Sequence, residues 1–167
     1  ERAGAATAAP DLMTEARQLL KSAESHLRRG EYRDARDQAA AGGILALHAR
    51  ATELEAGYPF GVVRQLFEPA LVRIEDDEAL FAGAAGLARH IADPTAPPPA
   101  KPVEDRFTVL HGLYWLTANL AERSGLVLTV DDVQWCDPTS LQFLAYLVPR
   151  LDDLTVAVVV GARTGEE

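Results

Sequence analysis

The sequence contains a single cysteine, two lysines and no long apolar run. Because Cys136 is alone, no disulfide can form within the chain, which is typical of a protein in a reducing compartment, and we expect a cytoplasmic protein. No stretch reaches the roughly 18 apolar residues of a membrane span, and no signal peptide is visible. We therefore expect no membrane partner.

Basic residues are also few. The chain has 16 lysines and arginines against 25 aspartates and glutamates, for a net charge of −9 at pH 7. The acids are dispersed and no basic cluster offsets them, so we expect no direct contact with nucleic acid from this segment. The remaining composition, 48% hydrophobic and 25% charged over 167 residues, is enough for one domain with a core. The first residue is Glu1, which indicates a fragment or a processed chain.

Two sequence motifs that would mark known chemistry are absent. There is no G-x-x-x-x-G-K-[S/T] phosphate loop, and neither Lys21 nor Lys101 follows glycines. Gly42 and Gly43 are no substitute, because they precede an apolar run, whereas a phosphate loop follows a strand and opens a helix. There is also no G-x-S-x-G turn of the kind that carries a serine nucleophile.

Three apolar runs, residues 44–50, 126–130 and 155–161, predict strands. They show little polar alternation, which is typical of a parallel sheet covered by helices. The segments between them have helical periodicity and predict helices over residues 62–71, 79–91, 105–123 and 138–148. The predicted fold class is therefore α/β, with an incomplete parallel sheet of about three strands flanked by helices.

Apolar spacing also predicts which side chains enter the core. In the last helix we expect one face to pack on the sheet, through Leu141, Leu144, Ala145, Val148 and Leu151. Core packing is the default for His111 and Trp115 in the long helix. His48 lies inside the first apolar run and is expected to be a packed core or sheet-edge histidine, because no partner acid is marked near it.

The N-terminal quarter differs in character and predicts a separate unit. Residues 1–10 are rich in alanine and are expected to form a disordered tail. Residues 11–42 predict a helical hairpin, and residues 43–167 the α/β domain. Residues 27–40 look like the turn and second helix of a tetratricopeptide repeat, but only one copy is present and such arrays need about three. A generic helical hairpin is therefore favoured.

Two adjacent acids follow the second apolar run. Asp131 and Asp132 are placed at the carboxyl end of a predicted strand, which is where open α/β sheets bind ligands. Mg²⁺ prefers carboxylate, phosphate and water oxygens, so paired acids suit a magnesium-dependent nucleotide site. Asp137 and Pro138 predict a helix start. The alternative is that the two acids serve only as a turn and helix cap.

Two segments resemble one protein family. VDDVQW resembles the Walker B strand end of the STAND ATPases, which are close to the AAA ATPases. The longer DDVQWCDPTSLQFLAYLVPRL is similar to the ATPase domain of large LuxR-type bacterial transcriptional regulators, and so is ATELEAGYPFGVVRQLFEPAL. The resemblance covers about residues 39–164 and implies a P-loop NTPase-like fold without its phosphate loop.

The resemblance implies ATP and Mg²⁺ as cofactors. Asp131 would hold the metal, Asp132 would polarise the attacking water, and Arg163 would sense the terminal phosphate of the nucleotide. A guanidinium suits that task because its planar fork of donors matches phosphate oxygens. The missing phosphate loop leaves open whether this chain binds any cofactor.

Two functions stay open from the sequence. The first is a partial nucleotide-binding ATPase module of a LuxR-type transcriptional regulator, inactive alone. The second is a non-catalytic protein-interaction module derived from an ATPase domain, with a TPR-like hairpin. Its partners would be other protein chains or the rest of a larger regulator. The sequence does not decide whether the chain is an enzyme.

Overall fold

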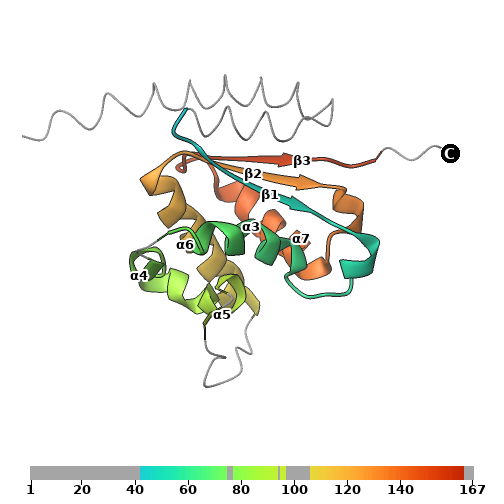
Figure 1. Ribbon diagram of the computed structural model, residues 1–167, viewed down its shortest axis with the longest axis horizontal. Coiled ribbons are helices and arrows are strands. Elements are labelled where there is room, and N and C mark those ends of the chain that lie inside the picture. The colour runs from blue at the N-terminus through green and yellow to red at the C-terminus, as the bar shows by residue number, and fades with distance from the viewer. Residues whose placement is uncertain (1–41, 75–76, 94, 97–105, 164–167) are drawn as a thin grey trace, which may run out of the picture.

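A three-stranded parallel sheet forms the centre of the protein (Figure 1). The computed structural model describes residues 42–74, 77–93, 95–96 and 106–163. The strands are β1 (Leu45–Arg50), β2 (Leu126–Asp131) and β3 (Val156–Val160), in the order β1-β2-β3. The α/β class and the three predicted strands are confirmed. The predicted tail and hairpin lie outside the described residues, apart from residue 42.

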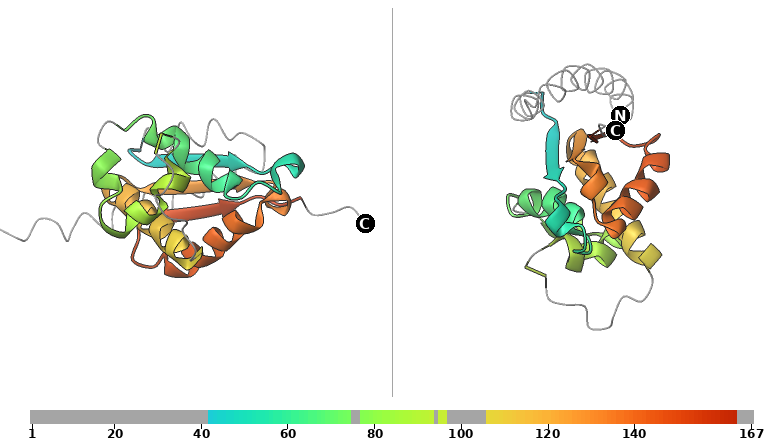
Figure 2. Two further views of the ribbon diagram at one scale, coloured as in Figure 1. Left: turned by 90° about the horizontal axis from the view of Figure 1, so that it is seen from below. Right: turned by 90° about the vertical axis from the view of Figure 1, so that its right-hand side faces the viewer.

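All described helices lie on one side of this sheet (Figures 1 and 2). The three longest are α3 (Gly61–Leu71), α6 (Arg106–Arg123) and α7 (Pro138–Leu147). The short ones are η1 (Glu53–Glu55), α4 (Asp77–Leu80), η2 (Gly83–Ala88), α5 (Arg89–Ala92), η3 (Val133–Trp135) and η4 (Val148–Arg150). No helix in this described part combines the length and apolarity needed to cross a bilayer.

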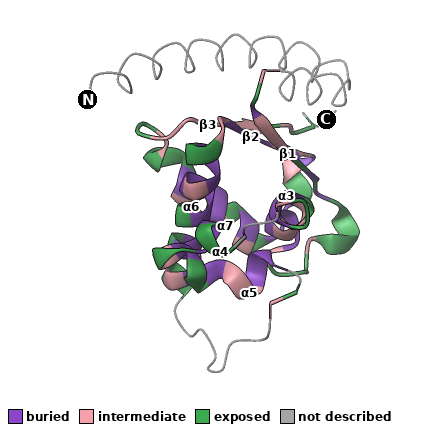
Figure 3. Ribbon diagram, turned by 60° about the vertical axis from the view of Figure 1, so that its left-hand side comes forward, coloured by how far each residue is buried: buried purple, intermediate pink, exposed green. Residues whose placement is uncertain are grey.

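The main core fills the space between the sheet and these helices (Figure 3). Alternate residues of β2, namely Leu126, Leu128 and Val130, face it and are buried. From the helical side, the rings of Phe67 and Phe143 meet edge to face with centroids 6.0 Å apart. β3 is only half-buried along most of its length, although a fully buried strand was expected. It is an outer strand of the described sheet, so one of its edges has no neighbouring strand there.

The prediction of a single helix over residues 79–91 is wrong. The chain forms α4, η2 and α5 in its place. Gly83 has a positive φ of 62°. A right-handed helix cannot continue through that left-handed backbone, and only glycine adopts it without strain. The alanine and leucine content of this segment indicated a helix, whereas the glycine divides it.

The prediction that His111 and Trp115 pack in the core is also wrong. Trp115 is 41% exposed, and its Nε1–H donates to Nε2 of His111 at 3.0 Å. The other ring nitrogen of His111 lies 3.2 Å from the hydroxyl of Tyr146. α6 buries other positions, among them Leu113, Leu116 and Leu120, and this leaves the two side chains on its outer surface.

The residues that α7 buries are not the set predicted from the apolar spacing. Leu144 is buried, but Leu141 and Val148 are exposed. The helix instead buries Phe143, Leu147 and the hydroxyl-bearing Ser140. The expected end near Val148 is confirmed, because α7 ends at Leu147 and Pro149 lies in η4. Ser140 in the first turn of α7 makes a buried hydrogen bond to α3, which is described below.

Candidate functional site

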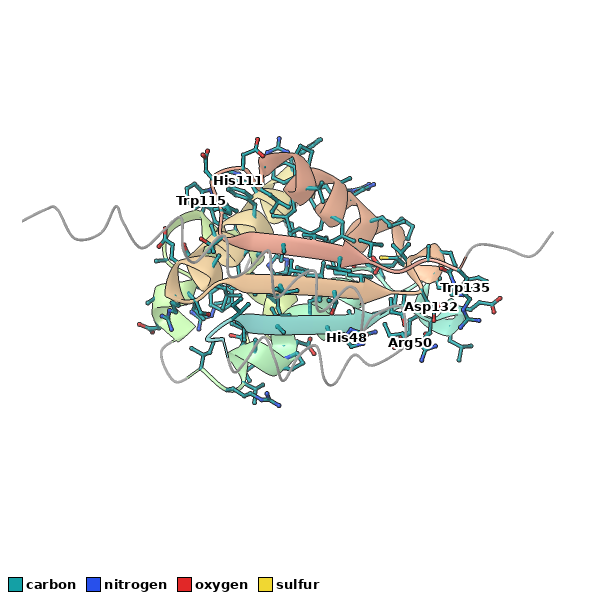
Figure 4. All side chains as sticks on the ribbon, turned by 90° about the horizontal axis from the view of Figure 1, so that it is seen from above. His48, Arg50, His111, Trp115, Asp132 and Trp135 are labelled. Atoms are coloured by element: carbon teal, nitrogen blue, oxygen red, sulfur yellow. The ribbon has the colours of Figure 1, made fainter. Side chains whose placement is uncertain are left out.

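The carboxyl ends of the three strands carry the candidate site. Asp131 is the last residue of β2 and pairs in register with Arg50, the last residue of β1. The N–H of Ala51 donates to the carbonyl of Asp131 at 3.0 Å, so the two strand ends are joined. Arg163 follows β3 at the same end of the sheet. Figure 4 shows Arg50 and Asp132 together at this end, with His111 and Trp115 at the opposite one.

Asp132 is held between two arginines. Its Oδ2 accepts a hydrogen bond from Nε of Arg50 at 3.1 Å and forms an ion pair with Nη2 of the same arginine at 3.0 Å. Arg163 donates from Nε to Oδ1 at 2.8 Å and from Nη2 to Oδ2 at 3.3 Å. Gln134 adds a bond to Oδ1 at 3.2 Å. The Asp132 side chain is 8% exposed, against 59% and 69% for Arg50 and Arg163. The carboxylate therefore lies beneath two guanidinium groups that face outward.

The backbone of Asp132 is left-handed, with φ 52° and ψ 43°. Aspartate tolerates this region better than most residues. The sharp turn lets the N–H of Asp132 donate to Oδ1 of Asp131 at 2.9 Å. It also starts η3, whose Gln134 accepts from the N–H of Arg163 at 3.3 Å. The turn after β2 therefore positions both acids and contacts the segment after β3.

Asp131 lies closely against a glycine of the neighbouring strand end. A Cβ atom built on Gly161 would lie 2.8 Å from Oδ1 of Asp131. The backbone of Gly161 is fixed on both sides, since its N–H donates to Val130 and its carbonyl accepts from Val133. Only a residue without a side chain leaves room for the Asp131 carboxylate in this position.

Asp137 joins the start of α7 to the start of α3. Its Oδ1 accepts from the N–H of Ser140 at 2.9 Å, which is the expected N-cap, and also from the N–H of Phe60 at 2.9 Å. Its Oδ2 accepts from the N–H of Val62 at 3.2 Å. Ser140 Oγ accepts from the N–H of Val63 at 3.1 Å. One buried carboxylate thus serves two helix N-termini, where free N–H groups favour a negative charge.

The comparison with known families is consistent with this arrangement. Residues 15–160 match the family model of the AAA ATPase domain. The chain belongs to the AAA ATPase domain family. The match begins inside the segment expected as a separate hairpin, residues 11–42, and ends shortly before Arg163. No match was found among curated proteins, and none among solved structures.

An AAA ATPase domain implies a nucleotide and Mg²⁺, and the residues can be tested for that fit. Asp131 fits a metal ligand: it stands at the strand end, its place is kept open by Gly161, and one of its oxygens bonds the backbone of Asp132. Asp132 fits less well as a ligand, because both of its oxygens already accept from guanidinium groups. Among the described residues, no three His, Cys, Asp or Glu side chains form a metal-binding group. A site with one carboxylate suits Mg²⁺ when phosphate oxygens and waters complete its shell.

The sequence-predicted residues are brought together, and two others join them. Asp131 and Asp132 are neighbours at one strand end, and Arg163 contacts Asp132 directly. Sequence reasoning missed Arg50 and Gln134. Arg50 ends the first predicted strand, and the carboxyl ends of parallel strands meet at one edge of a sheet. That rule could have identified it.

The pKa values of two buried carboxyls predict a pH dependence of stability. The hydrogen bond from Arg163 lowers the pKa of Asp132; burial opposes this, and Arg50 and Gln134 lower it further. Burial raises the pKa of Asp137, but the hydrogen bonds from Ser140, Thr139 and Val62 outweigh it and the net shift is downward. Such carboxyls bind fewer protons when folded. Their stabilising effect is complete above the unfolded value of about 3.9 and is lost as the pH falls through the folded values.

We therefore expect the free energy of unfolding to fall as the pH drops below about 4. Urea unfolding at a series of pH values measures it. In Asp132→Asn the fall should be shallower than in the parent chain, because one of the shifted carboxyls is gone. Asp153→Asn, which changes an exposed aspartate outside these ion pairs, serves as the matched control. Equal slopes in all three proteins would contradict the assigned role of the Asp132 ion pairs.

The single thiol is expected to be inert in the folded protein. Burial raises the pKa of Cys136 to about 12, and the neighbouring Asp137 carboxylate contributes to the rise. At pH 8 only roughly one thiol in ten thousand is then the reactive thiolate. A disulfide reagent should label Cys136 slowly in buffer and rapidly in concentrated urea. Fast labelling of the folded chain would show that the turn before α7 opens readily.

Proposed function

We propose that this chain is a nucleotide-binding part of an AAA-type ATPase module. In this proposal Asp131 holds Mg²⁺, Asp132 polarises the attacking water, and Arg163 contacts the terminal phosphate. The observation that carries it is the arrangement of these three residues at one end of the sheet, with Arg163 Nε 2.8 Å from Asp132 Oδ1. Open α/β sheets bind ligands at this end.

Each residue has a chemical reason for its role. Bound Mg²⁺ would neutralise charge on the phosphate oxygens. The Asp131 carboxylate is aimed by the N–H of Asp132 and given space by Gly161. Asp132 carries the negative charge needed to orient a water, but its oxygens must first lose part of their guanidinium contacts. Arg163 is the more exposed of its two basic partners and can turn outward to a phosphate.

We further propose that the parent protein is a LuxR-type transcriptional regulator. The two segments that resemble this family, residues 51–71 and 131–151, are in contact. The turn that ends at Phe60 donates its N–H to Asp137 at 2.9 Å. The same N–H lies 2.7 Å from Thr139 Oγ1. The two segments that resemble this family therefore pack together as one structural unit.

One surface favours the alternative function, a protein-interaction module without catalysis. On α6, Phe107, His111 and Trp115 lie four residues apart on one face, and Phe107 and Trp115 are 69% and 41% exposed. Exposed aromatic residues are typical of binding surfaces. In this alternative the acidic strand end is only a structural ion-pair cluster, and loss of Asp131 changes no ligand affinity.

Calorimetry with Mg-ATP separates the two functions. We expect a heat of binding in the parent chain, its loss in Asp131→Ala, and its retention in Asp153→Ala, a matched change of an exposed aspartate before β3. Gly161→Ala should also weaken binding, because its Cβ displaces the Asp131 carboxylate. No binding at millimolar Mg-ATP, with circular dichroism showing a folded chain, would rule out the proposed function for this chain.

A further inference from the structure

β3 is an outer strand of the described sheet, and the side of it that faces away from β2 is called the free edge below (Figure 4). The carbonyl of Thr155 accepts from the N–H of Leu126 at 2.9 Å, and Gly161 donates to the carbonyl of Val130 at 2.8 Å. In a parallel pair, alternate residues direct both their N–H and their carbonyl groups to the same neighbouring strand. The residues in between direct these groups to the free edge, where no described residue meets them; they are Val156, Val158 and Val160.

The side chains of β3 do not block the approach of a further strand. Its sequence is VAVVV, without a charge or a proline, and its register with β2 runs without a bulge. Charged side chains, prolines and bulges are the features that keep exposed strand edges from pairing with other chains. Val160 is also 47% exposed. The free edge of β3 therefore lacks the usual protection against strand pairing.

The opposite edge of the sheet, on β1, is protected. Leu45 and Ala51 direct their N–H groups to the β2 side, so His48 and Arg50 are among the residues whose backbone faces outward. The N–H of Arg50 is already bonded to Oε1 of Gln65 at 3.1 Å. Polar side chains and an occupied donor thus stand on β1 where β3 has only valines. Of the two edges, β3 is the one suited to accept another strand.

The two ends of β3 carry opposite charges. Asp152 and Asp153 shortly precede the strand and are exposed, and Arg163 follows it with 69% of its side chain exposed. An antiparallel second copy of β3 would bring each acidic end beside a basic end, whereas a parallel copy would bring like charges together. Asp153 and Arg163 lie equally far from Val158 in sequence. With Val158 opposite its counterpart, Asp153 therefore stands opposite Arg163 of the second copy.

We propose that the free edge of β3 binds a second copy of this chain, with the two strands antiparallel about a two-fold axis at Val158. In this register Val156 faces Val160 of the second copy, so every outward-facing N–H and carbonyl of both strands is paired. The three-stranded sheets of the two copies become one continuous sheet. The contact is closed, because it leaves no free β3 edge for a third copy. It needs no nucleotide and goes beyond the proposed function.

Sedimentation equilibrium of the whole chain, from about 10 μM to about 1 mM, tests the association. A short strand edge buries little area, so we expect a weak dimer whose mass rises with concentration from 18.0 kDa. Val158→Pro removes an outward N–H at an edge position and should raise the dissociation constant about tenfold or more. Asp153→Lys sets like charges opposite each other and should raise it about fivefold. Glu78→Lys makes the same charge change at an exposed residue of α4 and should leave it unaltered.

Amide hydrogen exchange followed by NMR locates the contact. As the concentration rises, we expect slower exchange at Val156, Val158 and Val160. The N–H groups of Ala157 and Val159 already bond to β2 and serve as the internal reference. An intermolecular NOE between the Hα atoms of Ala157 and of Val159 in the second copy would identify the antiparallel register, because these residues form a non-hydrogen-bonded pair, in which the Cα atoms lie closest.

Two results would overturn the proposal. One is a chain that stays monomeric over this range, as expected if the edge takes a strand of a different protein. The other is a dimer that is unchanged in both Val158→Pro and Asp153→Lys, since it would use another surface. If circular dichroism shows that Val158→Pro does not fold, Asp153→Lys and amide exchange in the parent chain decide the matter. These measurements contain no nucleotide, so a failure to bind Mg-ATP would end the proposed function and leave this proposal standing.

Discussion

Replacing Asp137 with alanine is expected to lower the free energy of unfolding by about 3 kcal/mol. Loss of a helix N-cap costs about 1 kcal/mol. The buried N–H of Val62 would also lose its acceptor, which costs about 1–3 kcal/mol more. The N–H of Phe60 keeps a second acceptor in Thr139 and should add little. Urea unfolding followed by circular dichroism measures the change.

Asp137→Asn is the matched control for this prediction. Asparagine is an equally good N-cap and retains the oxygen that serves Ser140 and Phe60, but its amide group cannot accept from Val62. We expect a loss of about 1–2 kcal/mol, clearly smaller than for alanine. If the asparagine variant were as stable as the parent chain, the start of α3 would not depend on the Val62 bond to this carboxylate. If the two variants were equally stable, the Oδ1 bonds to Ser140 and Phe60 would contribute nothing.

Asp137 also shows which contacts could be predicted from the sequence and which could not. Asp137 followed by Pro138 predicts a helix start, and the structure confirms it. The local pattern could not show that this carboxylate also binds the start of α3, because Phe60 and Val62 lie more than seventy residues away in sequence. Local capping rules describe one helix at a time. A contact shared by two helices depends on how they pack.

The strands were predictable for a similar reason. Continuous apolar runs are typical of parallel strands between layers, and all three were placed to within about two residues. The ends of the strands then placed Asp131, Asp132 and Arg163 near each other. What these residues do to one another was not predictable. Arg163 was expected to face a nucleotide phosphate, and in the described structure it pairs with Asp132.

Helix faces were the least predictable feature. α6 carries apolar residues on more than one side, with Phe107 and Trp115 exposed and Leu113, Leu116 and Leu120 buried. Periodicity alone therefore cannot assign the buried face. In the structure the backbone of η2 lies against Gly112, so this side of α6 faces inward.

Substitution of Gly112 is therefore expected to have a large effect on stability. A Cβ on Gly112 would lie 2.7 Å from the backbone nitrogen of Ala88 and 3.1 Å from Cβ of Leu87. Helix propensity alone favours alanine over glycine by about 1 kcal/mol. The nearest atom belongs to the backbone and cannot move away as a flexible side chain would, so overpacking by about 1–3 kcal/mol or more should prevail. We expect Gly112→Ala to destabilise the protein by about 2 kcal/mol, opposite in sign to the propensity.

Gly57→Ala provides the comparison, because a Cβ there meets nothing within 4 Å. The same chemical change should leave the free energy of unfolding within about 0.5 kcal/mol of the parent value. A second comparison uses Ala88→Gly in the Gly112→Ala background, which removes one of the two opposing Cβ atoms but leaves the backbone nitrogen in place. Little recovery is expected, because the closest clash involves that nitrogen. A stabilised Gly112→Ala chain would mean that η2 can move away from α6, and the packing that turns His111 and Trp115 outward would then not be fixed by Gly112.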